Sequence, residues 1–178
     1  MLVGFSMGTA VAVEAANILP GKVAGVVMVD GMMDPEFKYP PEMIPLLDSV
    51  MMDLVTNITN EKLVAMGFYK KNHEAAFKKI FSMHNGVSQV GWRESLQGDF
   101  KWTNEKCIES LKQLKVPVTA INSDMEPTNV EAFRKYIPSF RAKIMTDVGH
   151  LIFWDNPEEF NRLLEETIQE FMARSDTE

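Results

Sequence analysis

The chain begins with the stretch Met1-Leu2-Val3-Gly4-Phe5-Ser6-Met7-Gly8, which continues into the run 9–16, Thr-Ala-Val-Ala-Val-Glu-Ala-Ala. An apolar strand stub is followed by a Gly-x-Ser-x-Gly pattern and then by small residues that favour a helix. A turn this tight holds the serine in a strained backbone conformation, and the flanking glycines avoid a Cβ that would collide with the neighbouring chain. The pattern predicts that Ser6 stands clear of its surroundings at the start of a helix.

The start of that helix is suited to stabilising negative charge. Its free backbone N–H groups and the positive end of the helix dipole can stabilise an oxyanion on a bound carbonyl. This geometry suits acyl transfer, with the Ser6 hydroxyl as nucleophile. The alternative is that two glycines and a serine coincide in an ordinary glycine-containing loop.

Length and composition limit the classes of protein that fit. A chain of 178 residues is long enough for one domain with a real core, and its net charge of −7 argues against a nucleic-acid partner. The single cysteine, Cys107, cannot form an internal disulfide and fits a reducing cytoplasm. No apolar run reaches the roughly 18 residues of a membrane span, and the N-terminus does not resemble a signal peptide.

Strands and helices alternate in both outer parts of the sequence. Runs rich in apolar and β-branched residues over 22–30 and 116–122, and a shorter one over 142–146, are typical of buried parallel strands. Helices are expected after Ser6 as far as about residue 19, and over 129–136 and 157–173. This order predicts an α/β layered sheet.

The middle of the chain departs from that alternation, because residues 31–115 are too many for a simple crossover. They are read as an insertion with helices over 41–55, 60–70, 73–84 and 103–114. Seven of the thirteen methionines fall between Met32 and Met83. These flexible side chains suit either an adaptable apolar pocket or ordinary core packing.

A serine hydroxyl needs a base within hydrogen-bond reach, and the chain has three histidines. His73 and His84 lie in the insertion among lysines and are expected at solvated helix positions. His150 follows a predicted strand, and Gly149 before it allows a tight loop beyond the strand's C-terminal end, where open α/β sheets gather their active sites. We therefore expect His150 to be the base, with a core histidine as the alternative.

The acid that orients this imidazole should also follow a strand and lie between serine and histidine in the chain. The segment 120–129 offers Asp124, the first residue after the strand, and Glu126, two residues on. Either carboxylate can accept the His150 N–H, and the alternative is that both are surface charges. The spacing of His, Cys and Asp residues does not indicate a metal site.

With the order serine, carboxylate, histidine, the chain resembles the α/β-hydrolase family over nearly its whole length. Residues 4–8 are similar to the family's Gly-His-Ser-Met-Gly elbow, with Phe5 where histidine is frequent. Residues 148–150 and 155–160 resemble the family's Gly-His segment and its closing Asn-Pro-Glu-x-Phe helix, which is the more specific match.

The resemblance implies the C-terminal portion of an α/β-hydrolase fold, a parallel sheet with flanking helices and a helical cap insertion. Residues 32–115 would be the cap, between core segments 1–31 and 116–178. Met7 would supply one oxyanion-hole N–H, and Phe5 would contact substrate. No cofactor is implied.

The resemblance leaves the acid open between two residues. The family's Gly-x-x-Asp spacing, laid from Ser123, lands on Glu126, whereas a shortened loop puts the acid on Asp124. Aspartate is the commoner acid in this family and Asp124 directly ends the strand, so Asp124 is preferred and Glu126 is the alternative.

The family has several strands and a helix before the elbow, including the loop that supplies a second oxyanion donor. We therefore expect the chain to be a fragment of a longer protein. The strand stub Met1–Val3 would then be an unpaired sheet edge. We expect the isolated chain to be weakly active or inactive, or else to self-associate as a homo-oligomer through this edge.

These features predict a cytoplasmic serine hydrolase that acts on a small to medium ester or related acyl substrate through Ser6, His150 and Asp124 or Glu126. A non-catalytic or truncated ligand-binding protein of the same fold is the alternative. A nucleotide-binding α/β protein does not fit, because the glycines at 4 and 8 lack the following Lys-Ser/Thr pair or third glycine.

Overall fold

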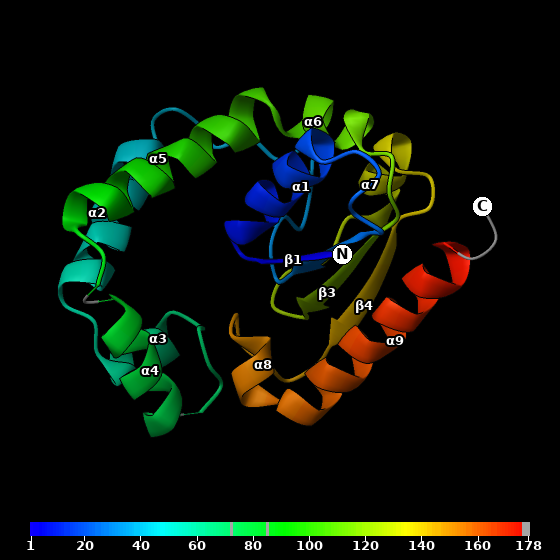
Figure 1. Cartoon of the computed structure of the whole chain (residues 1–178). Helices are drawn as coiled ribbons and strands as arrows, with labels where there is room; N and C mark the ends of the chain where they lie inside the picture. Colours follow the sequence, from blue (N-terminus) through cyan, green and yellow to red (C-terminus); the bar gives the residue numbers. More distant parts are fainter. Residues whose placement is uncertain (72, 85, 176–178) are drawn as a thin grey trace.

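Within the residues that the computed structural model describes, 1–71, 73–84 and 86–175, four parallel strands form one sheet in chain order (Figure 1). They are β1 (Leu2–Phe5), β2 (Val26–Val29), β3 (Val118–Ser123) and β4 (Arg141–Met145). Phe5 is level with Val29, and Val29 with Ile121. The carboxyl ends of the strands therefore share one edge, and the predicted parallel α/β sheet is confirmed.

Helices cover both faces of this sheet (Figure 1). The first face carries α1 (Gly8–Ile18), α6 (Cys107–Gln113) and α7 (Val130–Tyr136). The second face carries α8 (Ile152–Asp155) and α9 (Pro157–Ser175). Every residue of β2 and β3 is buried between these layers, which explains why β2 is a continuous apolar run and why β3 begins as an apolar, β-branched stretch.

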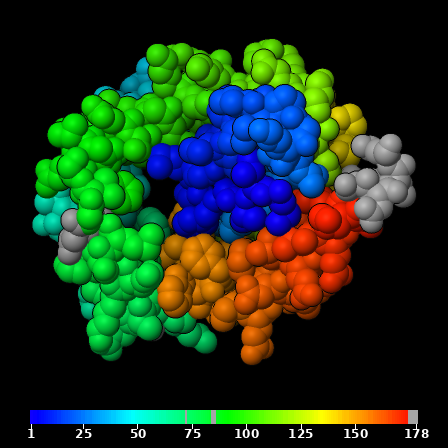
Figure 2. Space-filling model, viewed as in Figure 1, coloured from blue at the N-terminus to red at the C-terminus, as the bar shows by residue number. Residues whose placement is uncertain are grey.

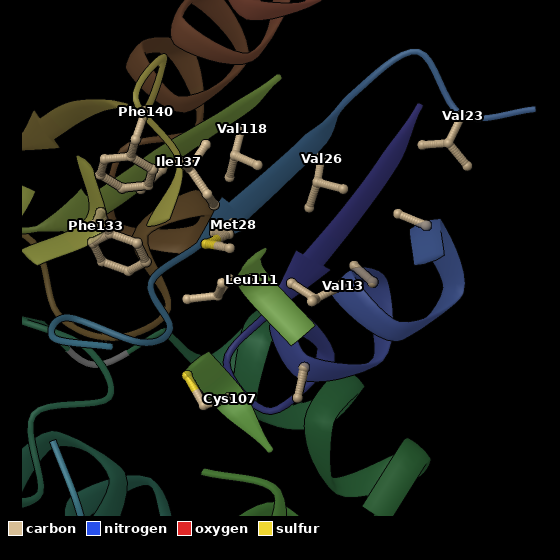
Figure 3. Close-up of a cluster of buried hydrophobic side chains, with 14 of the residues drawn as sticks. Val13, Val23, Val26, Met28, Cys107, Leu111, Val118, Phe133, Ile137 and Phe140 are labelled. Atoms are coloured by element: carbon tan, nitrogen blue, oxygen red, sulfur yellow. The ribbon is translucent and has the colours of Figure 1, made fainter. Parts of the chain in front are cut away.

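The two cores follow from the alternation of side chains along a strand. Val26 and Met28 of β2 point to the first face and pack with Val13, Leu111 and Phe133 from its helices, as Figure 3 shows. The residues between them, Val27 and Val29, point to the second face and pack with Ile152, Leu163 and Phe171. The sheet is therefore held by two separate apolar layers.

The insertion between β2 and β3 forms an arm that curves away from the sheet (Figure 1). It contains α2 (Ile44–Thr56), α3 (Asn60–Ala65), α4 (Glu74–His84) and α5 (Gln89–Glu105). Its own small core consists of Leu54, Leu63, Tyr69 and Ala76, and it includes one residue from the far end of the chain, Leu151. The arm is thus packed back onto the segment that follows β4.

Two helix expectations in the insertion are wrong in their boundaries. The helix predicted over 103–114 is broken at Lys106, which ends α5 and precedes α6 with φ −121° and ψ −25°. The helix predicted over 60–70 stops at Ala65, because Gly67 adopts φ +79°, a left-handed conformation that ends helices.

None of the helices in the described part of the chain is long and apolar enough to cross a bilayer.

Candidate active site

Ser6 occupies the sharp turn between β1 and α1. Its φ of +52° lies in the left-handed region, which is strained for a residue with a side chain. The turn is fixed by bonds on both sides, since the Ser6 N–H donates to Val29 O at 2.9 Å and the Ser6 carbonyl accepts from Thr9 N at 2.9 Å. A Cβ on Gly4 would lie 2.2 Å from Gly8 O, so the chain can cross itself here only with glycine at position 4.

The N-terminus of α1 lies beside Ser6 with no side chain capping it. Met7 precedes the helix at φ −52° and ψ −30°, and it lines the same cavity as Ser6. The first N–H groups of a helix have no partner within the helix. In α1 the Thr9 and Ala10 N–H groups donate to Ser6 O and Met7 O at 2.9 and 3.2 Å. The N–H groups ahead of them, together with the positive end of the helix dipole, can therefore face a negatively charged oxygen on a bound molecule.

The carboxylate beside His150 belongs to Asp30, the residue directly after β2. His150 Nδ1 lies 2.7 Å from Asp30 Oδ2, and the Asp30 side chain is only 3% exposed. Its other oxygen accepts the Ser123 N–H at 2.5 Å. Since an ionised carboxylate only accepts, Nδ1 is the donor, which leaves Nε2 as the acceptor of a neutral imidazole.

The loop that carries His150 is held by the insertion. The His150 N–H donates to Gly67 O at 2.8 Å, and the imidazole lies between two aromatic rings, with centroids 4.7 Å from Phe5 and 5.4 Å from Phe68. Phe5 also packs edge-on against Phe153 at 5.0 Å. The structure therefore places Phe5 against the imidazole, where it limits the orientations of the ring.

The structure does not bring the two expected acids to His150. The Asp124 side chain is exposed, and its Oδ2 accepts only a long bond, 3.4 Å, from Asp147 N. Glu126 is exposed at the wall of the cavity. The reason lies in the strand order: β2, which ends at Asp30, is next to β1 and Ser6, whereas Asp124 follows β3, one strand farther away.

The sequence contained a signal for Asp30 that was missed. It directly follows a buried strand, which is the same context that favoured Asp124, and it also precedes Gly31. A Cβ on Gly31 would lie 2.6 Å from Ser6 O, so this pair of residues lies directly against the turn that carries the serine.

Ser6, Asp30 and His150 line one cavity of about 690 Å³. Ser6 and His150 share its wall without a direct hydrogen bond, a separation that is common in sites without substrate. Figure 2 shows a hollow between the N-terminal segment, in blue, and the insertion, in green. Four aromatic side chains of the insertion line the cavity: Phe37, Tyr39, Phe68 and Trp102.

The cavity wall carries an excess of acidic side chains. Besides Asp30, it carries the carboxylates of Asp34, Asp99 and Glu126, and no Lys or Arg among the described residues lines it. Burial raises the pKa of Asp99 above its ordinary value. Burial also raises the pKa of Tyr39, with the negative charges of Asp99 and Glu126 adding to the effect.

Methionines contribute to the same wall. Met7 and Met125 come from the core segments, and Met32, Met33 and Met66 come from the methionine-rich insertion. Part of the methionine excess therefore does border a cavity. In the described ranges, no group of three or more His, Cys, Asp or Glu side chains is arranged to hold a metal ion.

Comparison with solved structures gives many similar folds at low sequence identity. An esterase from Exiguobacterium antarcticum superposes with a TM-score of 0.69 at 17% identity, over 95% of this chain and 66% of its own. A thermophilic esterase from Thermogutta terrifontis gives 0.70 at 19%, over 96% and 65%. MenH from S. aureus gives 0.69 at 17%, over 96% and 68%.

These structures agree on the fold and on the extent of the match. The chain spans about two thirds of their length, from 65% to 68%. No curated protein matches the sequence significantly. A family model described as the alpha/beta hydrolase family matches residues 1–163, which is most of the chain. The chain therefore belongs to the alpha/beta hydrolase family.

Proposed function

We propose that this hydrolase works through a nucleophilic serine, with Ser6, His150 and Asp30 as its triad. The observation that carries the proposal is the 2.7 Å contact between His150 Nδ1 and the buried Asp30 carboxylate, at the wall of the cavity that Ser6 also lines. Asp30 replaces Asp124 and Glu126 in this role. The order of the triad along the chain is then serine, aspartate, histidine, as expected for this fold.

In the proposed reaction, His150 Nε2 accepts the Ser6 Oγ proton while Oγ attacks the substrate carbonyl carbon. Asp30 holds the proton on Nδ1 and stabilises the imidazolium that forms. The Met7 N–H donates to the oxyanion of the tetrahedral intermediate. His150 then returns the proton to the leaving oxygen, which leaves an acyl group on Ser6 that water removes by the same steps.

We propose a small to medium ester, or a related acyl compound, as the substrate. Aromatic and methionine side chains on the cavity wall suit an apolar acyl or aryl group. The surplus of carboxylates on the same wall favours an uncharged or cationic substrate over an anionic one.

The triad is tested by labelling with a fluorophosphonate probe. Ser6→Ala should abolish labelling, and Asp30→Asn should slow it by about 10²-fold or more, because the imidazole loses the partner that fixes its tautomer. Asp124→Asn is the matched control and should label at the wild-type rate. A loss in Asp124→Asn with none in Asp30→Asn would make Asp124 the acid and overturn the proposal.

A second candidate function is binding of an acyl ligand without turnover. It rests on the cavity itself, because a wall of aromatic and methionine side chains would hold an acyl group whether or not Ser6 reacts. In this case the probe would not label the protein, while an ester would still bind Ser6→Ala.

The remaining expectations belong to the same proposal. We place residues 32–115 as a cap over the site, between core segments 1–31 and 116–178, of which the last three residues lie outside the described part of the chain. The single buried cysteine suits a reducing cytoplasm. Self-association through the β1 edge would appear as a dimer in light scattering.

A further inference from the structure

A buried carboxylate outside the proposed triad joins the histidine loop to the insertion. Asp155, the last residue of α8, has a side chain only 4% exposed. Its Oδ2 accepts the Gly149 N–H at 2.7 Å and the Lys70 N–H at 2.9 Å. Its Oδ1 lies 3.0 Å from His73 Nε2. One carboxylate thus bonds three groups, of which one adjoins His150 and two belong to the insertion.

Backbone contacts extend the same junction. The Leu151 N–H donates to Phe68 O at 2.8 Å, beside the bond from His150 N to Gly67 O. Gly149 lies so close that a Cβ there would be 2.5 Å from Gly67 O. The segments 67–70 and 149–151 therefore form a ladder of two backbone hydrogen bonds. The Asp155 carboxylate bonds to both segments, through Gly149 N and Lys70 N.

We propose that Asp155, supported by His73, is a positioning residue for the His150 imidazole, an inference that rests on the proposed triad. Asp155 touches neither Ser6 nor Asp30. It acts through its bond to the Gly149 N–H, because the position of Gly149 sets the direction in which the imidazole of His150 projects. Charge-assisted bonds to a buried carboxylate are strong, so the loop loses a defined position when the carboxylate is removed.

The expected effect is on the chemical step. A displacement of a catalytic group by about 1 Å can cost about 10²-fold in rate. Asp155→Ala should therefore lower kcat by about 10- to 100-fold, while KM for a p-nitrophenyl ester stays near the wild-type value. Asp155→Asn keeps an acceptor oxygen for Gly149 N and Lys70 N, and should recover most of kcat.

The matched control is Asp53→Ala. Asp53 is an exposed carboxylate of the same insertion that pairs with Lys62 at 2.7 Å and makes no contact with the histidine loop. Its removal should leave kcat and KM unchanged. An equal loss of kcat in Asp53→Ala would show that any damage to the insertion is enough, and would overturn a specific role for Asp155.

A second readout does not depend on turnover. The chain has only three histidines, so ¹⁵N-histidine spectra of the full chain can be assigned with His→Gln variants. Wild type should show His150 as the Nδ1–H tautomer, Asp30→Asn should lose that preference, and Asp155→Ala should show mixed tautomers. An unchanged tautomer and unchanged kcat in folded Asp155→Ala would overturn the inference.

The spectra also separate the two proposals. If wild type proves inactive, the proposed function fails, and the tautomer in Asp155→Ala still decides the positioning role. If Asp155→Ala does not fold, His73→Phe decides, because it removes only the partner of Oδ1. A His150 spectrum in His73→Phe identical to that of wild type would then count against the inference.

Discussion

At the scale of single residues, Gly149 lies directly against the backbone of the insertion. An added Cβ would meet only backbone, at 2.5 Å from Gly67 O, 2.8 Å from Phe68 O and 2.8 Å from Tyr69 Cα. Backbone cannot move aside as the end of a flexible side chain can. We expect Gly149→Ala to lower the free energy of unfolding by about 1–3 kcal/mol, the usual cost of overpacking, measured by urea denaturation.

Gly98 is the matched control for this substitution. It lies exposed within α5, and nothing stands within 4 Å of the position a Cβ would take. We expect Gly98→Ala to raise the free energy of unfolding by about 0.5–1 kcal/mol, because alanine is the better helix former. A Gly149→Ala variant as stable as wild type would show that the ladder between segments 67–70 and 149–151 can open without cost.

For single residues, the sequence predicted the backbone turns of the site better than it predicted which side chains bond to one another. The turn at Ser6 was predictable, because Gly4 is required by the nearby backbone of Gly8 and Thr9. The loop before His150 was also expected, but its glycine is required by the distant backbone of residues 67–69, which the sequence does not reveal. The partner of His150 was not predictable, since Asp30 and Asp124 both directly follow buried strands. Only the order of strands in space places Asp30 beside the serine turn and leaves Asp124 exposed.

At the scale of elements, helices with clear local signals were predictable and α5 was not. Asn129 caps α7 by accepting the Ala132 N–H at 3.1 Å, and Pro157 opens α9, and both starts were expected. Most of α5 was missed because Gly91 and Gly98 lower its helix propensity, although its Ser88 cap accepts the Gly91 N–H. Packing along α2 stabilises this helix, and a local sequence pattern does not report such packing.

The same helix provides a test through pH. Burial raises the pKa of Asp99 on α5, so between the unfolded and folded pKa values the folded chain binds more protons than the unfolded one. Wild-type stability therefore falls as the pH rises through this window, and the loss persists above it. We expect Asp99→Asn to melt about 2 °C higher than wild type at pH 7, a shift typical of a modest stabilisation in a chain of this size.

The difference should shrink as the pH is lowered from 7 toward 4 and below, because the Asp99 carboxyl is then protonated first in the folded chain and afterwards in the unfolded chain. Glu94→Gln serves as the control, because Glu94 lies on the exposed side of α5. Its melting temperature should follow that of wild type across the pH range. A gain for Asp99→Asn that is the same at pH 4 and pH 7 would contradict an origin in the buried charge.

At the scale of the whole molecule, the net charge of −7 and the charge of the cavity have the same sign. The summed field of such a protein disfavours the approach of anions to a cleft lined by carboxylates. The proposed hydrolase should therefore discriminate among acyl groups of equal size by their charge. The comparison to make is between a neutral p-nitrophenyl ester and one whose acyl chain ends in a carboxylate.

We expect kcat/KM for the anionic ester to be about 10-fold lower or more at low ionic strength, which corresponds to about 1.4 kcal/mol of repulsion in the transition state. Salt should narrow the gap, because the Debye length falls from about 30 Å at 0.01 M to about 10 Å at 0.1 M. Glu126→Gln, which removes one exposed carboxylate from the cavity wall, should narrow it as well. A gap unaffected by salt and by this substitution would mean that shape, and not charge, selects the acyl group.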